Sequence, residues 1–301
     1  MELITVLMCA YNETEVELKD SIKSILNQSY RHIEYIIVND NPANEMLSKV
    51  LTDFQQKDSR IRLVKNEKNI GLVSSLNRGW RLASGEYIAR MDADDIAKAD
   101  RLEKQLRFLK DNNYDFVGAG IQHIDESGNL ISPQLSFPET PKAIRKLTKK
   151  SNCVPHPTWL MKKSVMQALD GYRNIPYCED FDFVLRAQNH GFKLGNVQEL
   201  GLFYRIRSNG ISSSNQAVQR LTANYLAQNW NRIDSCGPDE LKMYLESKEA
   251  KRYFDFVGCQ MQGLNSEASF GRKVMQMFCK CWNNRFFWMY IYERIYILFS
   301  K

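Results

Sequence analysis

The chain has 301 residues, of which 44% are hydrophobic and 25% are charged. This length allows one large domain with an appendage or two domains, and the apolar fraction excludes an intrinsically disordered protein. The formal net charge of +6 comes from scattered basic residues, so no nucleic-acid partner is predicted. Such an excess suits anionic ligands or an anionic membrane face.

The seven cysteines include no Cys-x-x-Cys pair, and several lie in apolar runs. This odd number of cysteines predicts reduced thiols in a cytoplasmic protein rather than a disulfide scaffold. The first residues lack the basic stretch of a signal peptide, and no apolar run reaches the ~18–20 residues of a transmembrane helix. We therefore expect a cytoplasmic protein.

Strands and helices alternate along the first hundred residues. Apolar runs predict strands over 3–10, 34–39 and 61–64 and one that ends at Asp92, and helical spacing predicts helices over 15–27, 44–56 and 69–82. This order predicts right-handed βαβ units and a mostly parallel sheet with helices on both faces.

The second half of the chain changes in character near residue 215. Helices are expected over 101–109 and 181–189, strands over 115–120, 158–161 and 202–206, and a hairpin over 121–132. After residue 215 the pattern predicts only helices, over 217–230 and 238–257. The sequence therefore predicts an α/β domain over 1–215 and a helical C-terminal extension over 216–301.

Three carboxylates, Asp92, Asp94 and Asp95, follow the fourth predicted strand directly. The carboxyl ends of parallel strands meet at the crevice where open α/β sheets bind ligands. Asp92 and Asp94 can converge there on a hard divalent cation that also binds phosphate oxygens. The alternative is a solvated acidic loop before the next helix. Since the sequence has neither a Gly-rich dinucleotide fingerprint nor a phosphate loop, phosphate binding would fall to such a cation.

A series of short motifs occurs in a fixed order over roughly residues 3 to 215. The motifs are Ala10-Tyr11-Asn12-Glu13, Val38-Asn39-Asp40, Asn69-Ile70-Gly71, the stretch 85–95, His156-Pro157-Thr158, Gly171-Tyr172, Glu179-Asp180-Phe181-Asp182 and Tyr204-Arg205. This ordered set resembles the family 2 inverting glycosyltransferases. The resemblance implies an α/β GT-A fold with a Rossmann-like, mostly parallel sheet, a nucleotide-sugar half over about 1–97 and an acceptor half over about 98–215.

The resemblance also implies a UDP-sugar donor and a Mn²⁺ or Mg²⁺ ion. Asp94 matches the metal ligand, and Asp92 matches a residue that faces the ribose or the metal. The other matching donor-binding positions are Ala10, Tyr11, Glu13, Asp40, Asn69, Gly71, Arg90 and Ala93. Asp40 would accept the N3–H of the base, and Tyr11 would stack on it unless it belongs to the core. Arg90 would contact a phosphate or sugar hydroxyl, or else pair with Asp92 or Asp95.

Inversion requires a base that deprotonates the acceptor hydroxyl opposite the leaving group. Asp180 matches that base, although it could merely cap a helix. His156, Trp159 and Glu179 are candidate acceptor contacts; His156 could instead be structural, and Trp159 could be a core residue. Arg205 and Arg207 are candidate diphosphate contacts. Arg207 stands where many relatives have a His that completes the metal site, which puts strict metal dependence in doubt.

These features predict an inverting, metal-dependent, non-processive glycosyltransferase. It would move one hexosyl or N-acetylhexosaminyl group from a UDP-sugar to a glycan or undecaprenyl-linked glycan in bacterial surface-polysaccharide synthesis. The alternatives are a nucleotidyltransferase, or a catalytically weak nucleotide-sugar-binding or scaffolding subunit. Aromatic and basic residues over 272–301 predict either peripheral contact with the inner face of the plasma membrane or packing on protein, including a second copy of the chain.

Overall fold

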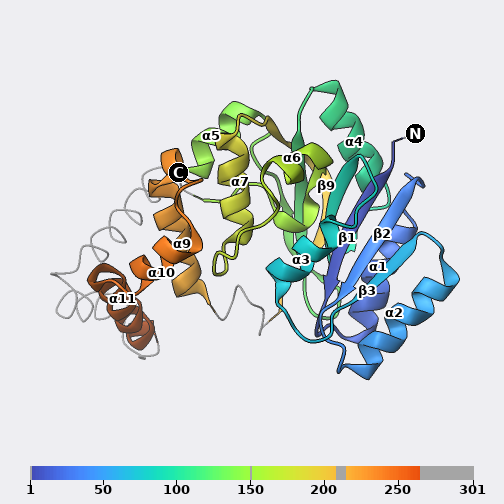
Figure 1. Ribbon diagram of the computed structural model, residues 1–301, viewed down its shortest axis with the longest axis horizontal. Helices are drawn as coiled ribbons and strands as arrows, with labels where there is room; N and C mark the ends of the chain where they lie inside the picture. Colours follow the sequence, from blue (N-terminus) through green and yellow to red (C-terminus); the bar gives the residue numbers. More distant parts are fainter. Residues whose placement is uncertain (1, 150, 208–214, 265–301) are drawn as a thin grey trace.

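The structure is a computed structural model that describes residues 2–149, 151–207 and 215–264, with side chains through residue 257. Its central feature is a nine-stranded sheet of order β3-β2-β1-β4-β8-β6-β9-β5, with β7 paired to β6 (Figure 1). The strands are β1 (Ile4–Ala10), β2 (Ile33–Asn39), β3 (Ile61–Lys65), β4 (Tyr87–Asp92), β5 (Ile96–Ala97), β6 (Phe116–Ile124), β7 (Leu130–Leu135), β8 (Leu160–Lys162) and β9 (Leu194–Arg205).

Helices cover both faces of this sheet and continue beyond it (Figure 1). The α-helices are α1 (Glu15–Leu26), α2 (Glu45–Lys57), α3 (Leu72–Trp80), α4 (Arg101–Asp111), α5 (Pro141–Thr148), α6 (Lys163–Ala168), α7 (Glu179–Asn189), α9 (Gln216–Gln228), α10 (Pro238–Leu245) and α11 (Lys248–Leu264). Two 3-10 helices, η1 (His156–Thr158) and η2 (Trp230–Arg232), interrupt the connections.

The first four strands form the predicted parallel unit. β1 lies between β2 and β4 and pairs parallel with both, and β2 pairs parallel with β3. Beyond β4 the sheet becomes mixed, because β8 pairs antiparallel with both β4 and β6. The carboxyl ends of β1, β2 and β4 therefore lie at one edge of the sheet, with Ala10 beside Asn39 and Cys9 beside Asp92.

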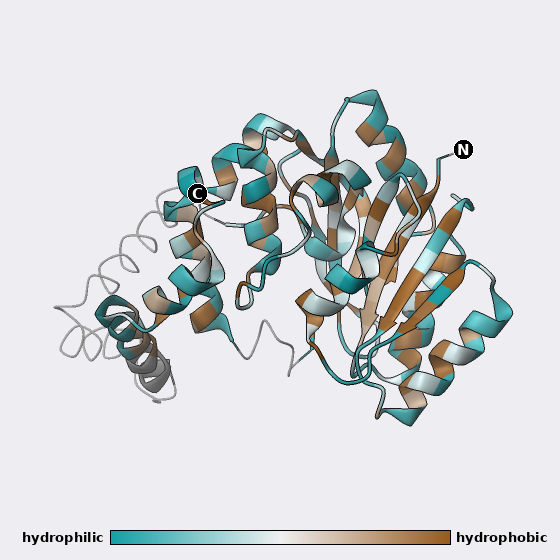
Figure 2. Ribbon diagram, viewed as in Figure 1, coloured by the Kyte–Doolittle hydropathy of each residue, from teal (hydrophilic) through white to brown (hydrophobic). Residues whose placement is uncertain are grey.

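Alternating side chains place one apolar core on each face of the sheet, as the brown bands of Figure 2 show. One core receives α1, α2 and α4, for example through Ile22, Leu51 and Leu106. The other receives α3, α5, α6 and α7, for example through Leu76 and Phe183. Both faces are thus sealed, and polar side chains gather where the strands end.

The helical segment after residue 215 shares a core with α7. Ile175, Phe181 and Leu185 pack with Leu226 of α9 and Leu241 of α10. This apolar contact spans the predicted boundary near residue 215, so α9 and α10 rest directly on the helix that carries Asp180. The predicted helices over 217–230 and 238–257 correspond to α9, α10 and the first part of α11.

Some predicted elements were wrong in extent. The strand expected over 158–161 is preceded by η1 and begins only at Leu160, because Pro155 and Pro157 favour a tight turn there. The strand expected over 202–206 begins much earlier, at Leu194, and short helices α5 and α6 were not predicted. In the part of the chain that the structure describes, no helix is long and apolar enough to cross a membrane. The segment 272–301 lies outside the described residues.

Candidate active site

Asp40 organises the loop at the end of β2. Its Oδ1 accepts hydrogen bonds from Asn66 Nδ2 at 2.7 Å and from Ile70 N at 2.9 Å, and its Oδ2 accepts one from Gly71 N at 3.0 Å. Asn69 Oδ1 also accepts from Gly71 N, which has φ +84° and begins α3. The structure therefore brings together Asp40, Asn69 and Gly71. Three of the roughly four acceptor positions of the Asp40 carboxylate are used, which leaves room for one more donor.

The loop after β1 presents an exposed aromatic ring beside a carboxylate. Tyr11 is 47% exposed, so the alternative that it belongs to the core is wrong. Its backbone N–H donates to Glu13 Oε2 at 2.8 Å, and its carbonyl accepts from Asn41 at 3.0 Å. Burial raises the pKa of Glu13 to about 7, and the charge of Asp94 adds to this rise. Ala10 is fully buried, so a side-chain contact between Ala10 and a donor is excluded.

The acidic stretch after β4 is partly buried rather than a solvated loop. The side chains of Asp92 and Asp94 are 30% and 24% exposed, whereas Asp95 and Ala93 are buried. Burial, together with the charge of Asp92, raises the pKa of Asp94 to about 6. Burial likewise raises the pKa of Asp95, which accepts Arg205 N through Oδ1 while its Oδ2 is buried without a partner. Repulsion between these carboxylates would fall if a cation bound among them.

Two arginines that were predicted to contact the donor are buried and bond to other groups of the protein. Arg90 is 2% exposed and pairs with Asp92 Oδ1, so its proposed contact with a phosphate or sugar is wrong and the salt-bridge alternative is confirmed. Arg205 is also buried. Its Nε donates to Asp94 O at 2.8 Å, and its NH1 donates at 2.9 Å to the carbonyls of Asp125 and Glu126. Arg205 therefore fixes the acidic loop and is not available to a diphosphate.

Arg207 forms an ion pair with Asp94, the first of the two candidate metal ligands. Its Nε is 3.1 Å from Asp94 Oδ2, and its NH2 donates to Glu17 Oε2 at 2.7 Å. Glu17 also forms a capping box with Thr14 at the start of α1, which holds its carboxylate in place. Arg207 thus places a positive charge against Asp94, where a metal ion would otherwise balance the charge of the acids.

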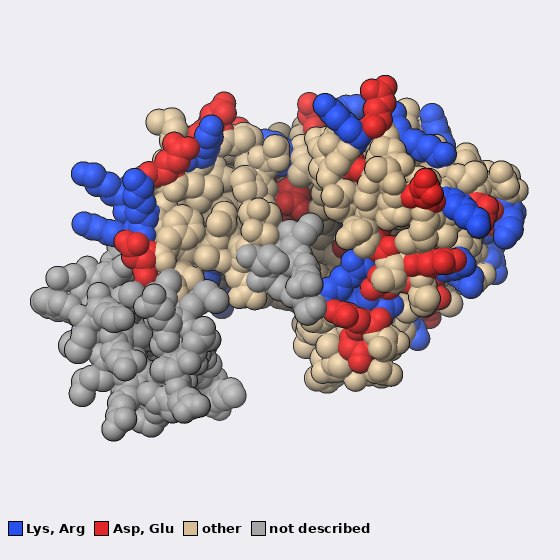
Figure 3. Space-filling view, turned by 90° about the horizontal axis from the view of Figure 1, so that it is seen from below, with Lys and Arg blue, Asp and Glu red and all other residues tan. Residues whose placement is uncertain are grey.

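Asp180 lies at the start of α7, across from the acidic stretch. Its Oδ1 accepts from Phe181 N at 2.7 Å, and its Oδ2 accepts from Asn152 Nδ2 at 2.8 Å. Burial raises the pKa of Asp180, and the negative charge of Asp92 adds to the rise. Figure 3 shows acidic side chains deep in a hollow near the middle of the molecule.

Glu179 is the neighbour of Asp180 in the first turn of α7. Burial raises its pKa to about 7, and the charge of Asp180 contributes to this rise. A buried ion network anchors the same helix, because Asp182 pairs with Arg173 and, at 2.9 Å, with Arg186. Arg186 also donates at 2.7 Å to the carbonyls of Leu169 and Gly171. These contacts fix the first turn of α7, which carries Glu179 and Asp180.

An aromatic cluster supports the floor between the two acidic groups. Trp159 is fully buried, donates through Nε1 to Val154 O at 2.9 Å and stacks on Tyr172 with ring centroids 6.0 Å apart. The predicted sugar-stacking role of Trp159 is therefore wrong, and its core alternative is confirmed. His156 Nε2 lies 2.9 Å from Tyr172 Oη, and burial, helped by the charge of Arg90, lowers the pKa of this imidazole so that it is neutral. An acceptor contact by His156 stays a prediction.

Comparison with known proteins decides the family. The family model described as glycosyl transferase family 2 matches residues 5–170, more than half of the chain. The chain belongs to glycosyl transferase family 2. It is 36% identical over 230 residues to an uncharacterized glycosyltransferase of Methanocaldococcus jannaschii, which covers 76% of this chain and 79% of the relative. It is 34% identical over 217 residues to the O-antigen biosynthesis glycosyltransferase WbnJ of Escherichia coli, covering 71% and 84%.

Solved structures agree with this assignment at the level of the fold. The crystal structure of S. aureus TarS 1-349 in complex with UDP-GlcNAc superposes with a TM-score of 0.59 at 16% identity, covering 92% of this chain and 70% of that one. The predicted α/β GT-A fold of this family 2 glycosyltransferase is therefore confirmed, and so is the prediction that the chain is an enzyme.

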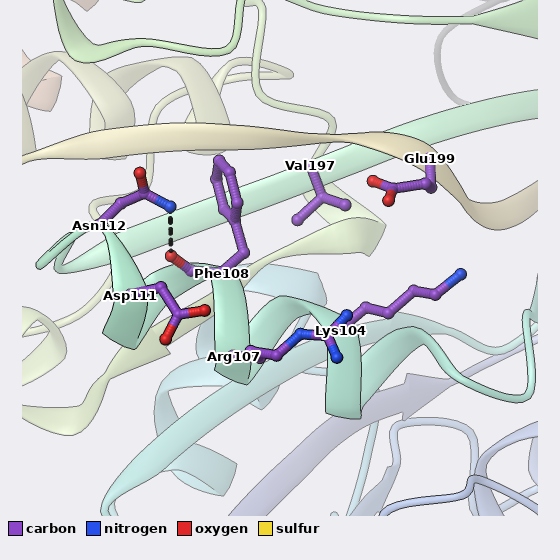
Figure 4. Close-up of a pocket in the computed structure, with 7 residues that line it drawn as sticks. All are labelled: Lys104, Arg107, Phe108, Asp111, Asn112, Val197 and Glu199. Atoms are coloured by element: carbon purple, nitrogen blue, oxygen red, sulfur yellow. Dashed lines mark hydrogen bonds between the residues drawn. The ribbon is translucent and has the colours of Figure 1, made fainter.

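The sequence reasoning missed two residues that hold the site of this glycosyltransferase together. Glu17 anchors Arg207, and its signal was the readable Thr14-x-x-Glu17 capping box. Asn152 holds Asp180 from a segment 28 residues away, and no sequence pattern marks it. A separate small pocket of about 110 Å³ lies between α4 and β9, lined by Arg107, Phe108 and Glu199 among others (Figure 4). It contains none of the candidate catalytic residues.

Proposed function

We propose that this family 2 enzyme transfers one sugar, with inversion, from a UDP-sugar to a glycan or lipid-linked glycan acceptor in surface-polysaccharide synthesis. The observation that carries the proposal is the carboxylate of Asp180, which Phe181 N and Asn152 hold in place, in the same domain as the loop where Asp40, Asn69 and Gly71 gather. The O-antigen role in the name of WbnJ supports the pathway, and the UDP-GlcNAc bound to TarS supports the donor class.

In the proposed reaction, the acceptor hydroxyl oxygen attacks the anomeric carbon of the donor while the bond from that carbon to the diphosphate oxygen breaks. The proton of the hydroxyl passes to Asp180, and UDP leaves with the bonding electrons. Asp180 suits this role because burial and Asp92 raise its pKa, which makes it a stronger base than an ordinary carboxylate. Its hydrogen bonds from Phe181 N and Asn152 fix the direction in which it accepts the proton.

At the donor end, we propose that Tyr11 stacks on the uracil and that Asp40 accepts its N3–H. The exposed ring of Tyr11 and the unused acceptor position of Asp40 support these contacts. Glu13, Asn69 and Gly71 lie along the same strand ends and would border the ribose. Arg207 would contact the diphosphate once it separates from Asp94.

The acidic pair fits a hard divalent cation such as Mn²⁺ or Mg²⁺ in its donor chemistry, because Asp92 and Asp94 supply carboxylate oxygens whose charges repel each other. Within the described ranges no group of three or more His, Cys, Asp or Glu side chains is placed to hold a metal ion, so phosphate oxygens of the donor would complete the ligand set. A bound cation would stabilise the charge that builds on the leaving diphosphate. Arg207 competes for Asp94, so we propose that metal dependence is moderate rather than strict.

The test is release of UDP from a panel of UDP-sugars by the full chain, with and without Mn²⁺, together with the melting temperature for each donor. We expect slow hydrolysis of one donor and a higher melting temperature with it, because ligand binding stabilises the folded state. The same assay is run on Asp180→Asn. Asp239→Asn is its matched control, because Asp239 is an exposed acid at the second position of α10 and Asp180 holds the second position of α7. Binding of UDP-sugars without hydrolysis or transfer would favour the scaffolding alternative, and no binding of any UDP-sugar would refute the donor class.

A further inference from the structure

We propose that the cavity between α7 and α9 binds a neutral, hydroxyl-rich sugar of the acceptor, and that α9 supplies the wall that determines which sugar fits. This inference rests on the proposed role of Asp180 as the base. It assigns a site to a helix that lies beyond residues 5–170, where the family model ends.

The cavity has a volume of about 390 Å³, within the range of small-molecule sites. Asp180 lines it together with Asn152 and Phe181 on the side of α7, and Gln219, Ala223 and Asn224 line it on the side of α9. A sugar hydroxyl in this cavity would lie beside the carboxylate that accepts the proton. Phe181 is buried and packs in the apolar cluster beneath the cavity, so it forms part of the floor and not a stacking surface.

The polar groups of the cavity match a carbohydrate in their chemistry. Side-chain amides donate and accept hydrogen bonds, as sugar hydroxyls do. Asn224 makes no side-chain hydrogen bond within the part of the chain that the structure describes, and Gln219 uses only its Nε2, which donates to Tyr177 O at 3.0 Å. One carboxylate, Asp180, and one guanidinium, Arg220, line the cavity, so their charges balance and a neutral ligand is favoured over an anion.

The wall is held at a fixed distance from the base. Cys178 donates to Gln219 O at 3.3 Å, which ties α9 to the residue that precedes α7. Below this contact, Phe181 and Leu185 pack with Tyr225 and Leu226 in one apolar cluster. These contacts between α7 and α9 fix the distance between Asn224 and Asp180. A change in the side chains of α9 would therefore alter the shape of the cavity directly.

The experiment is saturation-transfer NMR on the full chain with methyl glycosides of glucose, galactose and N-acetylglucosamine, and with glycerol 3-phosphate as the anionic probe. Two variants change the wall: Asn224→Ala removes an amide, and Ala223→Leu fills the cavity. Gln228→Ala is the matched control, because Gln228 is exposed on the same helix and does not line the cavity. The melting temperature with UDP is measured for every variant.

We expect at least one glycoside to bind the wild type and Gln228→Ala, and both wall variants to weaken it about fivefold or more, in line with one lost hydrogen bond or lost space. The shift in melting temperature with UDP should be the same in all four proteins. Absence of glycoside binding by the wild type, or binding by both Asn224→Ala and Ala223→Leu that equals that of the wild type, overturns the inference. Preference for glycerol 3-phosphate overturns the neutral class of ligand. Loss of the UDP shift in the wild type would instead refute the proposed function, whatever the glycosides do.

Discussion

Replacing Asp180 by Asn separates a catalytic role from a capping role. Asn is nearly isosteric, and its Oδ1 can still accept from Phe181 N, so this side-chain contact in the first turn of α7 is preserved. What the substitution removes is the capacity to accept a proton. Loss of a general base costs about 10²–10⁴ in rate, or roughly 3–5 kcal/mol of transition-state stabilisation.

The folding stability should change little. The amide of Asn at position 180 would meet the amide of Asn152, so one hydrogen bond of about 0.5–1.5 kcal/mol is lost. Against this, a carboxylate whose pKa is raised by burial and by Asp92 is replaced by a neutral group, which is favourable at neutral pH. These effects oppose each other, and we expect the melting temperature to stay within about 4 °C of the wild type.

The assay is the initial rate of sugar transfer, or of UDP release where the acceptor is unknown, with melting temperature and donor affinity measured on the same samples. Asp239→Asn controls for the loss of a first-turn acid in a helix. A rate for Asp180→Asn above a tenth of the wild type would show that Asp180 caps α7 and is not the base. A rate that falls together with donor affinity would place the defect in binding.

Three further outcomes follow from the contacts described above. Arg207→Gln should raise Mn²⁺ affinity about threefold or more, measured by electron paramagnetic resonance against Arg62→Gln, because a cation is removed from Asp94; unchanged affinity would contradict the competition. Glu179→Gln should stabilise the protein at about pH 8 by ~1–2 kcal/mol but not at about pH 4. The folded-state pKa of Glu179 is raised from 4.5 to about 7, so its contribution to stability is complete below 4.5 and is lost as pH rises through 7; equal effects at both pH values would refute this. Trp159→Ala should cost about 3–5 kcal/mol in urea unfolding, and a loss below about 1 kcal/mol would contradict its core position.

The sequence was informative where local pattern and chemistry coincide. The strands β1 to β4 and the acids that follow them could be predicted because apolar runs end abruptly in polar residues whose positions also match a family motif. Asp40 and Gly71 were both predicted to contact the donor. The structure brings them together, because the Asp40 carboxylate accepts a hydrogen bond from Gly71 N. Their contact with a nucleotide stays a prediction.

The sequence was misleading where burial decides the role of a side chain. Arg90, Arg205 and Trp159 have the chemistry of ligand contacts, yet tertiary packing places all three inside the protein. Whereas Arg90 pairs with Asp92, as the salt-bridge alternative stated, Arg205 and Trp159 donate to the backbone atoms Asp94 O and Val154 O, which carry no sequence signal. The same holds for Asn152, whose pairing with Asp180 depends on how two distant segments meet.

The apolar cluster shared by α7 and α9 has a consequence for exchanging parts between related enzymes. A chimera that joined residues 1–215 of this chain to another relative's carboxyl-terminal helices would leave Phe181 and Leu185 against foreign side chains. We expect α7, which carries Asp180, to shift in such a chimera even though every motif residue is retained. Transplanting α7 and α9 as one unit keeps their interface native, so this pair of helices is the natural fragment for recombination and for altering substrate preference by design.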